Sequence, residues 1–249
     1  MCEIQIRIVV VISAGQEWDI VRERFGHNGL SHSPYGEWCT AQVDVGGRAE
    51  PVVFFHEGWG KIAAAAATQY AIDRWQPQLI VNLGTCGGFE GAIAREAVVL
   101  VERTLVYDII EQMGDPEAAL RHYATDLDLS WLAEPYPMPV QRGLLLSGDR
   151  DLVAEEVPLL RARFDAAAGD WESGAIAYVA ARNGVRCLIL RGVTDLVGAD
   201  GGEAYDGTVD FFRAQARIVM TRLLDALPDW LACVNWKLET GNWKLETRS

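Results

Sequence analysis

Residues Gly60–Gly88, which read GKIAAAAATQYAIDRWQPQLIVNLGTCGG, are the part of the chain that says most about its fold. Their first part, Gly60–Trp75, is rich in alanine, the residue with the best helix propensity, and Pro77 lies just beyond its end. Their second part, Leu79–Leu83, is typical of a short buried strand and runs into a glycine-rich turn at Gly84–Gly88. A helix followed directly by a buried strand is typical of an α/β protein.

The same alternation continues in both directions along the chain. On the N-terminal side we predict a strand at Ile4–Ser13, a helix at Gln16–Phe25, a loop at Gly26–Gly36, and strands at Glu37–Val45 and Pro51–Glu57 around the Gly46-Gly47 turn. On the C-terminal side we predict strands at Ala97–Val101, Gly143–Ser147 and Arg186–Val193, an irregular segment at 111–142, and helices at Trp171–Asn183 and Gly207–Leu227.

The last predicted helix is amphipathic. One face carries Val209, Phe212, Ala216, Val219, Leu223 and Leu227. No linker-like stretch divides the body, so we expect one domain over residues 1–232. The expected architecture is an α/β three-layer sandwich with a mixed, largely parallel central sheet.

Composition limits the possible functions. The 249 residues are half apolar and carry a net charge of −13, which argues against binding to nucleic acid or an anionic membrane. The five cysteines form no CxxC pair and the four histidines have no metal-ligand spacing, so no metal or cofactor is expected. Scattered thiols and the lack of a signal peptide predict a cytoplasmic protein with reduced cysteines.

The C-terminus contains a repeat. Residues 235–240 read NWKLET, and the same six letters recur at 242–247. Two short copies cannot form a solenoid, which needs at least about three units. We therefore expect 233–249 to be a non-native or disordered tail outside the fold.

Polar residues follow several predicted strands at their carboxyl ends, where ligands bind in open α/β sheets. Glu17 follows the first strand, Thr85 lies in the glycine-rich turn, and Asp149 and Asp195 follow two later strands. Glu172 opens the helix before the last of these strands. Convergent carboxylates suit cleavage of a glycosidic bond, in which one acid protonates the leaving group and another activates water. The glycine cluster fits neither a Walker A loop nor GxGxxG.

Three motifs carry a resemblance to a known family. They are Asn82–Phe89 (NLGTCGGF), Asp170–Ala180 (DWESGAIAYVA) and Arg191–Val197 (RGVTDLV), with supporting similarity at Gly58–Ala64 and Ser147–Asp149. In this order and at these spacings, the chain resembles the methylthioadenosine/S-adenosylhomocysteine nucleosidases of the purine and uridine phosphorylase superfamily, and the plant-type nucleosidases look most similar. The resemblance extends from Ile6 to about Leu227 and implies the nucleoside phosphorylase fold, a small purine nucleoside as ligand and a homodimer.

The resemblance also implies a role for each matching residue. Asp195 would donate a proton or hydrogen bond to N7 of the departing purine, a step worth about 10²–10⁴ in rate. Glu172 would hold the ribose 2′- and 3′-hydroxyls, and Glu17 would activate the attacking water. Further substrate contacts are implied for Thr85, Gly87, Leu152, Trp171 and Tyr205.

Four positions depart from the family pattern. Counting from the first strand places the family's catalytic Glu at Trp18, whereas counting back from Phe25 places it at Glu17, which alone of the two has the required chemistry. Trp171 replaces a Met, and Tyr205 replaces a Phe of the 5′-substituent pocket. The segment Tyr107–Met113 differs from the loop that the family's partner subunit contributes. The 5′ group of the substrate therefore stays open.

Two alternatives remain at the level of sequence. Phosphorolysis on the same fold needs cationic anchors, and Asn82 stands where uridine-type phosphorylases place an Arg, so water is the favoured nucleophile. A catalytically inactive, nucleoside-binding member is the second alternative, supported only by the spacing at Glu17. A Rossmann dehydrogenase lacks its fingerprint here.

Overall fold

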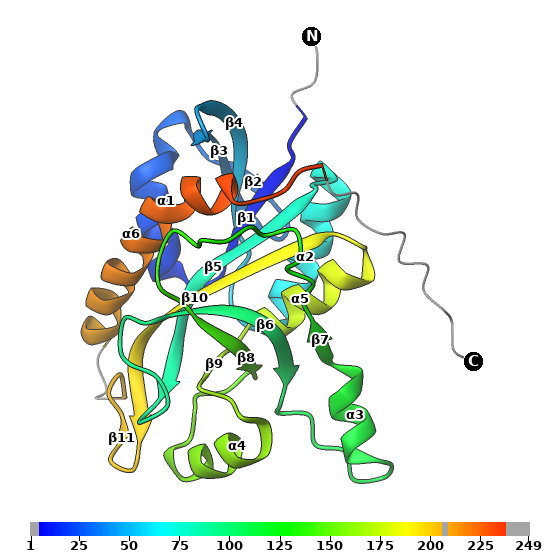
Figure 1. Cartoon of the computed structure of the whole chain (residues 1–249), viewed down its shortest axis with the longest axis vertical. Coiled ribbons are helices and arrows are strands. Elements are labelled where there is room, and N and C mark those ends of the chain that lie inside the picture. Colours follow the sequence, from blue (N-terminus) through cyan, green and yellow to red (C-terminus); the bar gives the residue numbers. More distant parts are fainter. Residues whose placement is uncertain (1–4, 206–208, 238–249) are drawn as a thin grey trace.

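Three strands of the sheet, β4, β1 and β5, run parallel to one another (Figure 1). The computed structural model describes residues 5–205 and 209–237. β1 (Ile8–Ile12) lies between β4 (Arg48–His56) and β5 (Leu79–Phe89), and every residue of β1 is buried. Burial on both faces explains why β1 is an unbroken β-branched run instead of an alternating pattern.

Further strands close part of this sheet into a ring. β10 (Arg186–Gly198) runs parallel to β5 and antiparallel to β6 (Val98–Val106). β6 is parallel to β8 (Gln141–Ser147), and β9 (Ala168–Asp170) pairs with both β8 and β5. The remaining strands extend the sheet further: β3 (Gly36–Val45) lies between β4 and β2 (Ser31–Ser33), β7 (Ala124–Asp126) pairs with β6, and β11 (Gly201–Gly202) pairs with β10. The sheet is therefore mixed, with a parallel centre.

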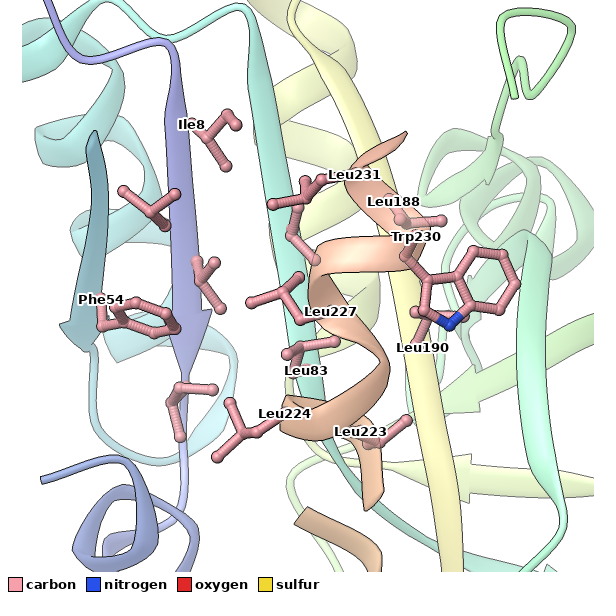
Figure 2. Packing of buried hydrophobic residues seen from close by; sticks show 14 of the residues in the cluster. Ile8, Phe54, Leu83, Leu188, Leu190, Leu223, Leu224, Leu227, Trp230 and Leu231 are labelled. Atoms are coloured by element: carbon pink, nitrogen blue, oxygen red, sulfur yellow. The ribbon is translucent and has the colours of Figure 1, made fainter. Parts of the chain in front are cut away.

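Helices cover both faces of the sheet, as the sequence predicts. α1 (Gly15–Phe25) and α6 (Asp210–Ala232) lie on one face, and α2 (Gly60–Trp75) and α5 (Ser173–Arg182) lie on the other (Figure 1). Figure 2 shows how α6 packs: its apolar residues, among them Leu227 and Trp230, meet side chains of β1, β4, β5 and β10. Two short helices, α3 (Pro116–His122) and α4 (Val157–Phe164), complete the fold.

The predicted glycine-rich turn at 84–88 is wrong, because these residues belong to β5. None of Gly84, Gly87 and Gly88 has a positive φ. Their role is to leave space: a Cβ on Gly84 would lie 1.9 Å from Nη1 of Arg191, and one on Gly88 would lie 2.7 Å from a methyl group of Ile93. The glycines allow close approach of neighbouring chains.

The strand predicted at Arg186–Val193 is also longer than expected. β10 continues to Gly198, so Asp195 lies inside the strand and not beyond its end. A shift in register between Val193 and Asp195 marks a bulge, which brings Asp195 opposite Gly87 of β5. Bulges often redirect a side chain next to a functional site.

Other predicted boundaries change in smaller ways. β1 is shorter than Ile4–Ser13, and residues 1–4 lie outside the described part of the chain. The loop predicted at Gly26–Gly36 contains the 3-10 turn Gly26–Asn28 and β2, and the segment 111–142 contains α3 and β7. Gly207 lies outside the described residues, α6 extends to Ala232, and Val209 is 50% exposed and not on the buried face.

The start of the C-terminal tail packs against the body. Val234 is buried and bridges to Leu132, and the N–H of Asn235 donates to the carbonyl oxygen of Trp131 at 2.8 Å. Residues 238–249, which hold most of the repeat, lie outside the described residues. Among the helices of the described chain, none combines the length and the apolar character needed to cross a bilayer.

Candidate active site

Glu17 lies in the first turn of α1 and is 1% exposed. One carboxylate oxygen accepts the N–H of Ala14 at 3.2 Å and so closes the start of the helix. The other accepts both the N–H and the hydroxyl of Thr85 on β5, at 2.6 and 2.7 Å. The carboxylate is thus held in one orientation at the carboxyl end of the sheet.

Trp18, the other position considered for the catalytic Glu, faces away from Thr85. Its indole N–H donates to Glu37 on β3, and its ring stacks on His56 with centroids 5.5 Å apart. Of the two residues, Glu17 is the one whose side chain is hydrogen-bonded to Thr85 of β5.

Arg191 on β10 provides the buried cation of the site and is 1% exposed. Its Nε donates to the hydroxyl of Ser173 at 2.9 Å and lies 3.0 Å from a carboxylate oxygen of Asp170. Nη1 donates to the carbonyl oxygen of Thr85 at 3.4 Å, and Nη2 lies 3.7 Å from a carboxylate oxygen of Glu172. Nη2 is buried and has no hydrogen-bond partner within the described chain, so it retains a free donor.

Glu172 is the N-cap residue of α5. One oxygen accepts the N–H of Gly60, the first residue of α2, at 3.0 Å. Burial raises the pKa of Glu172, and Arg191 opposes this while Asp170 and Glu17 add to it. A carboxylate with one oxygen on a helix N-terminus and the other near a guanidinium has lone pairs left to accept hydrogen bonds from hydroxyl groups.

Asp195 lies on β10, opposite Gly87 of β5. Its Oδ1 accepts the hydroxyl of Thr194 at 2.7 Å, and burial raises the pKa of its carboxyl group. Its Oδ2 is 3.8 Å from the point that a Cβ on Gly87 would occupy, and the side chain of Leu152 is 2.9 Å from the same point. Gly87, Leu152 and Asp195 therefore line one wall.

The spacing along β5 brings Glu17 and Asp195 to one small region. Thr85, the partner of Glu17, and Gly87, the partner of Asp195, are two residues apart in a strand and face the same side. Two residues of extended chain cover about 6.7 Å. The carboxyl groups of Glu17 and Asp195 are therefore both held against the same short stretch of β5.

The remaining predicted contact residues lie around this region. Tyr205 is 46% exposed, and its hydroxyl accepts the N–H of Leu152 at 3.0 Å. Burial, followed by the carboxylates of Asp151 and Asp195, raises the pKa of Tyr205. Trp171 is partly buried and directly precedes Glu172.

Sequence reasoning missed several buried polar residues of the site. It assigns no role to Asp170, Ser173 and Arg191, although all three stand inside the quoted motifs, and it ends a predicted strand at Glu57 without giving that residue a function. Two signals were present: Arg191 interrupts the apolar run between Leu188 and Val193, and Glu57 directly follows β4 at the rim that holds the other carboxylates.

Within residues 5–205 and 209–237 there is no group of three His, Cys, Asp or Glu side chains that could hold a metal ion. A groove of about 1320 Å³ runs past α4 and β8, and ion pairs such as Arg142–Glu102 and Arg163–Glu117 occupy its rim. None of the carboxylates described above lines this groove.

Comparisons with known proteins identify the family of this chain. Residues 7–228 match the family model of the phosphorylase superfamily. A 5′-methylthioadenosine/S-adenosylhomocysteine nucleosidase of Halalkalibacterium halodurans is 30% identical over 211 residues, which cover 80% of this chain and 90% of that protein.

Solved structures show the same fold. The Streptococcus pneumoniae MTA/SAH nucleosidase in complex with 8-aminoadenine has a TM-score of 0.74 at 17% identity, covering 92% of this chain and 100% of that one. A mutant Helicobacter pylori MTAN with 5′-methylthioadenosine in the active site has a TM-score of 0.72 at 17% identity, covering 90% of this chain and 98% of that one.

Proposed function

This chain belongs to the phosphorylase superfamily, and we propose that it hydrolyses the N-glycosidic bond of a purine nucleoside of the 5′-methylthioadenosine/S-adenosylhomocysteine type. The observation that supports this most strongly is that Thr85 and Gly87, the β5 partners of Glu17 and Asp195, are two positions apart in that strand, with Glu172 nearby. This arrangement provides a base, an acid and a sugar-binding carboxylate for one small molecule.

The proposed reaction uses each carboxyl group once. Asp195 enters protonated, as its raised pKa favours, and gives its proton to N7 of the base while the C1′–N9 bond breaks. Glu17 takes a proton from water, whose oxygen bonds to C1′. Glu172 accepts hydrogen bonds from the ribose hydroxyls, and these strengthen as the ring gains positive charge. The products are the free base and a reducing sugar.

Phosphorolysis is the competing reaction, and the buried guanidinium of the site must be considered as a phosphate-binding group. Asn82 is buried and donates to the carbonyl oxygen of Val11, so it offers no cation, but Arg191 lies close by. Asp170 and Glu172 already pair with Arg191, and the carboxylate of Glu17 stands beside Thr85. A phosphate dianion would enter a region with an excess of negative charge, whereas neutral water would not.

A nucleoside panel tests the proposal. Purified protein in phosphate-free buffer should release adenine from 5′-methylthioadenosine or S-adenosylhomocysteine, measured by chromatography, with an equal amount of reducing sugar. Strict dependence on phosphate, with a sugar 1-phosphate as product, would instead show phosphorolysis. Binding of adenine without turnover of any nucleoside would show an inactive member of the superfamily.

We also propose that the protein is a homodimer. Large apolar side chains are exposed at the start of α2 and in the segment after Asp108: Trp59 at 68%, Ile62 at 86%, Ile110 at 78% and Met113 at 98%. Lys61 pairs with Asp108, which links the start of α2 to the segment that carries Ile110. A second copy of the chain would remove this apolar surface from water.

A cytoplasmic location is likewise proposed. Its support is the state of the four described cysteines, Cys39, Cys86, Cys187 and Cys233, all of which are free thiols. Fractionation of cells that express the protein tests it, and recovery from an oxidising compartment would contradict it.

A further inference from the structure

The carboxyl group of Glu57 is buried within electrostatic reach of Glu172 and Arg191, and it has no role in the reaction as written above. Glu57 directly follows β4 and is 2% exposed. Its two oxygens accept hydrogen bonds from the hydroxyls of Ser13, at 3.0 Å, and Thr68, at 3.4 Å. Among the residues that the structure describes, no Lys, Arg or His forms an ion pair with it.

A short turn connects Glu57 to Glu172. The chain passes from Glu57 through Gly58 and Trp59 to Gly60, whose N–H donates to the carboxylate of Glu172 at 3.0 Å. Gly58 and Gly60 have φ values of +78° and +79°, which residues other than glycine rarely adopt. The turn therefore fixes the position of Glu57 relative to the sugar-binding carboxylate.

The charges in this region do not balance. Arg191 is the buried cation, and the carboxyl groups of Glu17, Asp170 and Glu172 all act on it. Glu57 adds a fourth carboxyl group. The negative charge of Glu172 makes the ionised form of Glu57 less favourable. Several buried like charges around one cation cannot all be ionised, so at least one of these acids must hold a proton.

We propose that Glu57 is a positioning residue that holds this proton, so that Glu172 stays ionised and accepts hydrogen bonds from the sugar hydroxyls. The inference rests on the proposed function. Glu57 suits the role because it has only two neutral hydroxyls as partners, whereas Asp170 and Glu172 each have Arg191.

The expected pH dependence follows from the surroundings of Glu57. Burial raises its pKa to about 8, helped by the charge of Glu172 and opposed by Ser13, Arg191 and Thr68. The other titratable neighbours are Glu172 itself, whose pKa burial also raises to about 8, and Cys187 on β10, whose thiol pKa is raised by burial and by Glu57. As the pH rises through the pKa of Glu57, the new charge repels that of Glu172 and weakens nucleoside binding.

The first measurement needs no substrate. An acid whose pKa is higher in the folded than in the unfolded protein stabilises the fold fully below its unfolded pKa, near 4.5, and loses this effect as the pH rises to about 8. The Glu57→Gln variant carries a permanently neutral amide. Its unfolding free energy from urea titrations should therefore fall less steeply over this pH range than that of wild type. Equal slopes would overturn the proposal.

The second measurement isolates the coupling to Glu172. Asp195→Asn removes the titration of the proposed general acid, and the dissociation constant of 5′-methylthioadenosine is then measured by calorimetry between about pH 6 and 9.5. Above the pKa of Glu57, affinity should fall by up to about tenfold per pH unit. The double variant with Glu57→Gln should keep its affinity across this range.

Two controls sharpen the result. Ser13→Ala removes a hydrogen bond that favours the ionised form of Glu57, so the loss of affinity should begin at a higher pH. Glu50→Gln, on the same strand but paired with Arg7, should leave the profile unchanged. If affinity falls equally at high pH with and without Glu57→Gln, the coupling is refuted. If the wild-type protein releases no base, the proposed function is refuted instead.

Discussion

At the scale of single residues, Glu17 shows how one side chain serves both fold and site. One oxygen closes the start of α1 through the N–H of Ala14, and the other is held by Thr85. From the sequence alone, the family's catalytic Glu aligns with either Glu17 or Trp18, because a turn accommodates a shift of one residue at little cost. The contact with Thr85 joins segments 68 positions apart, so only the folded chain could place it.

Replacing Asp195 tests the proposed general acid. Asp195→Asn removes the transferable proton and should lower the rate of base release by about 10²–10⁴ with little change in melting temperature. Because burial raises the pKa of Asp195, wild-type activity should fall as the pH rises above that pKa. The matched control is Asp200→Asn, an exposed carboxyl group on the neighbouring turn, which should retain full activity. Equal activity of both variants would contradict the assignment.

Arg191 is expected to matter for stability as well as for activity. Arg191→Met leaves the buried carboxylates of Asp170 and Glu172 without their cation, which should cost about 3–5 kcal/mol of unfolding free energy in urea titrations. Arg191→Lys keeps the charge but not the planar set of donors that reaches Ser173 and Thr85. It should be intermediate in stability. A fully stable methionine variant would show that the cluster is not held together by this ion pair.

At the scale of elements, the glycines of β5 leave space for the side chains of the site. A Cβ on Gly84 would lie 1.9 Å from Arg191 and 3.1 Å from Glu17, so Gly84→Ala must displace the guanidinium. We expect a loss of about 1–3 kcal/mol in stability together with a large loss of activity. Gly15→Ala, in the first turn of α1 with open space around it, is the control and should be neutral or slightly stabilising. Unfolding titrations and base release measure both effects.

At the scale of the whole molecule, the proposed dimer should depend on the apolar side chains at the start of α2. Ile62→Glu places a charge on a side chain that is 86% exposed in the single chain and buried in the proposed dimer. It should weaken association by at least about tenfold in sedimentation velocity experiments. Ile218→Glu on α6, which is 46% exposed, should leave association unchanged. A wild-type protein that sediments as a monomer at high concentration would contradict the proposal.

Local sequence signals suffice for the fold class and for most of the elements. Helix propensity and the proline beyond its end predict α2 with its observed bounds, Gly60–Trp75, and the apolar run predicts β1, because these signals depend on neighbouring residues alone. The family motifs also identify Glu172 and Asp195 as candidates before any contact is known, and the count back from Phe25, together with the chemistry required, adds Glu17.

The assembly of the site, in contrast, follows only from the folded chain. That Gly84–Gly88 is strand, that Asp195 sits at a bulge, and that Arg191 and Glu57 join the cluster all depend on contacts between β5, β10 and segments distant in sequence. The local sequence pattern predicts which residues are buried. The charge state of a buried group, however, depends on which other charges the fold places beside it.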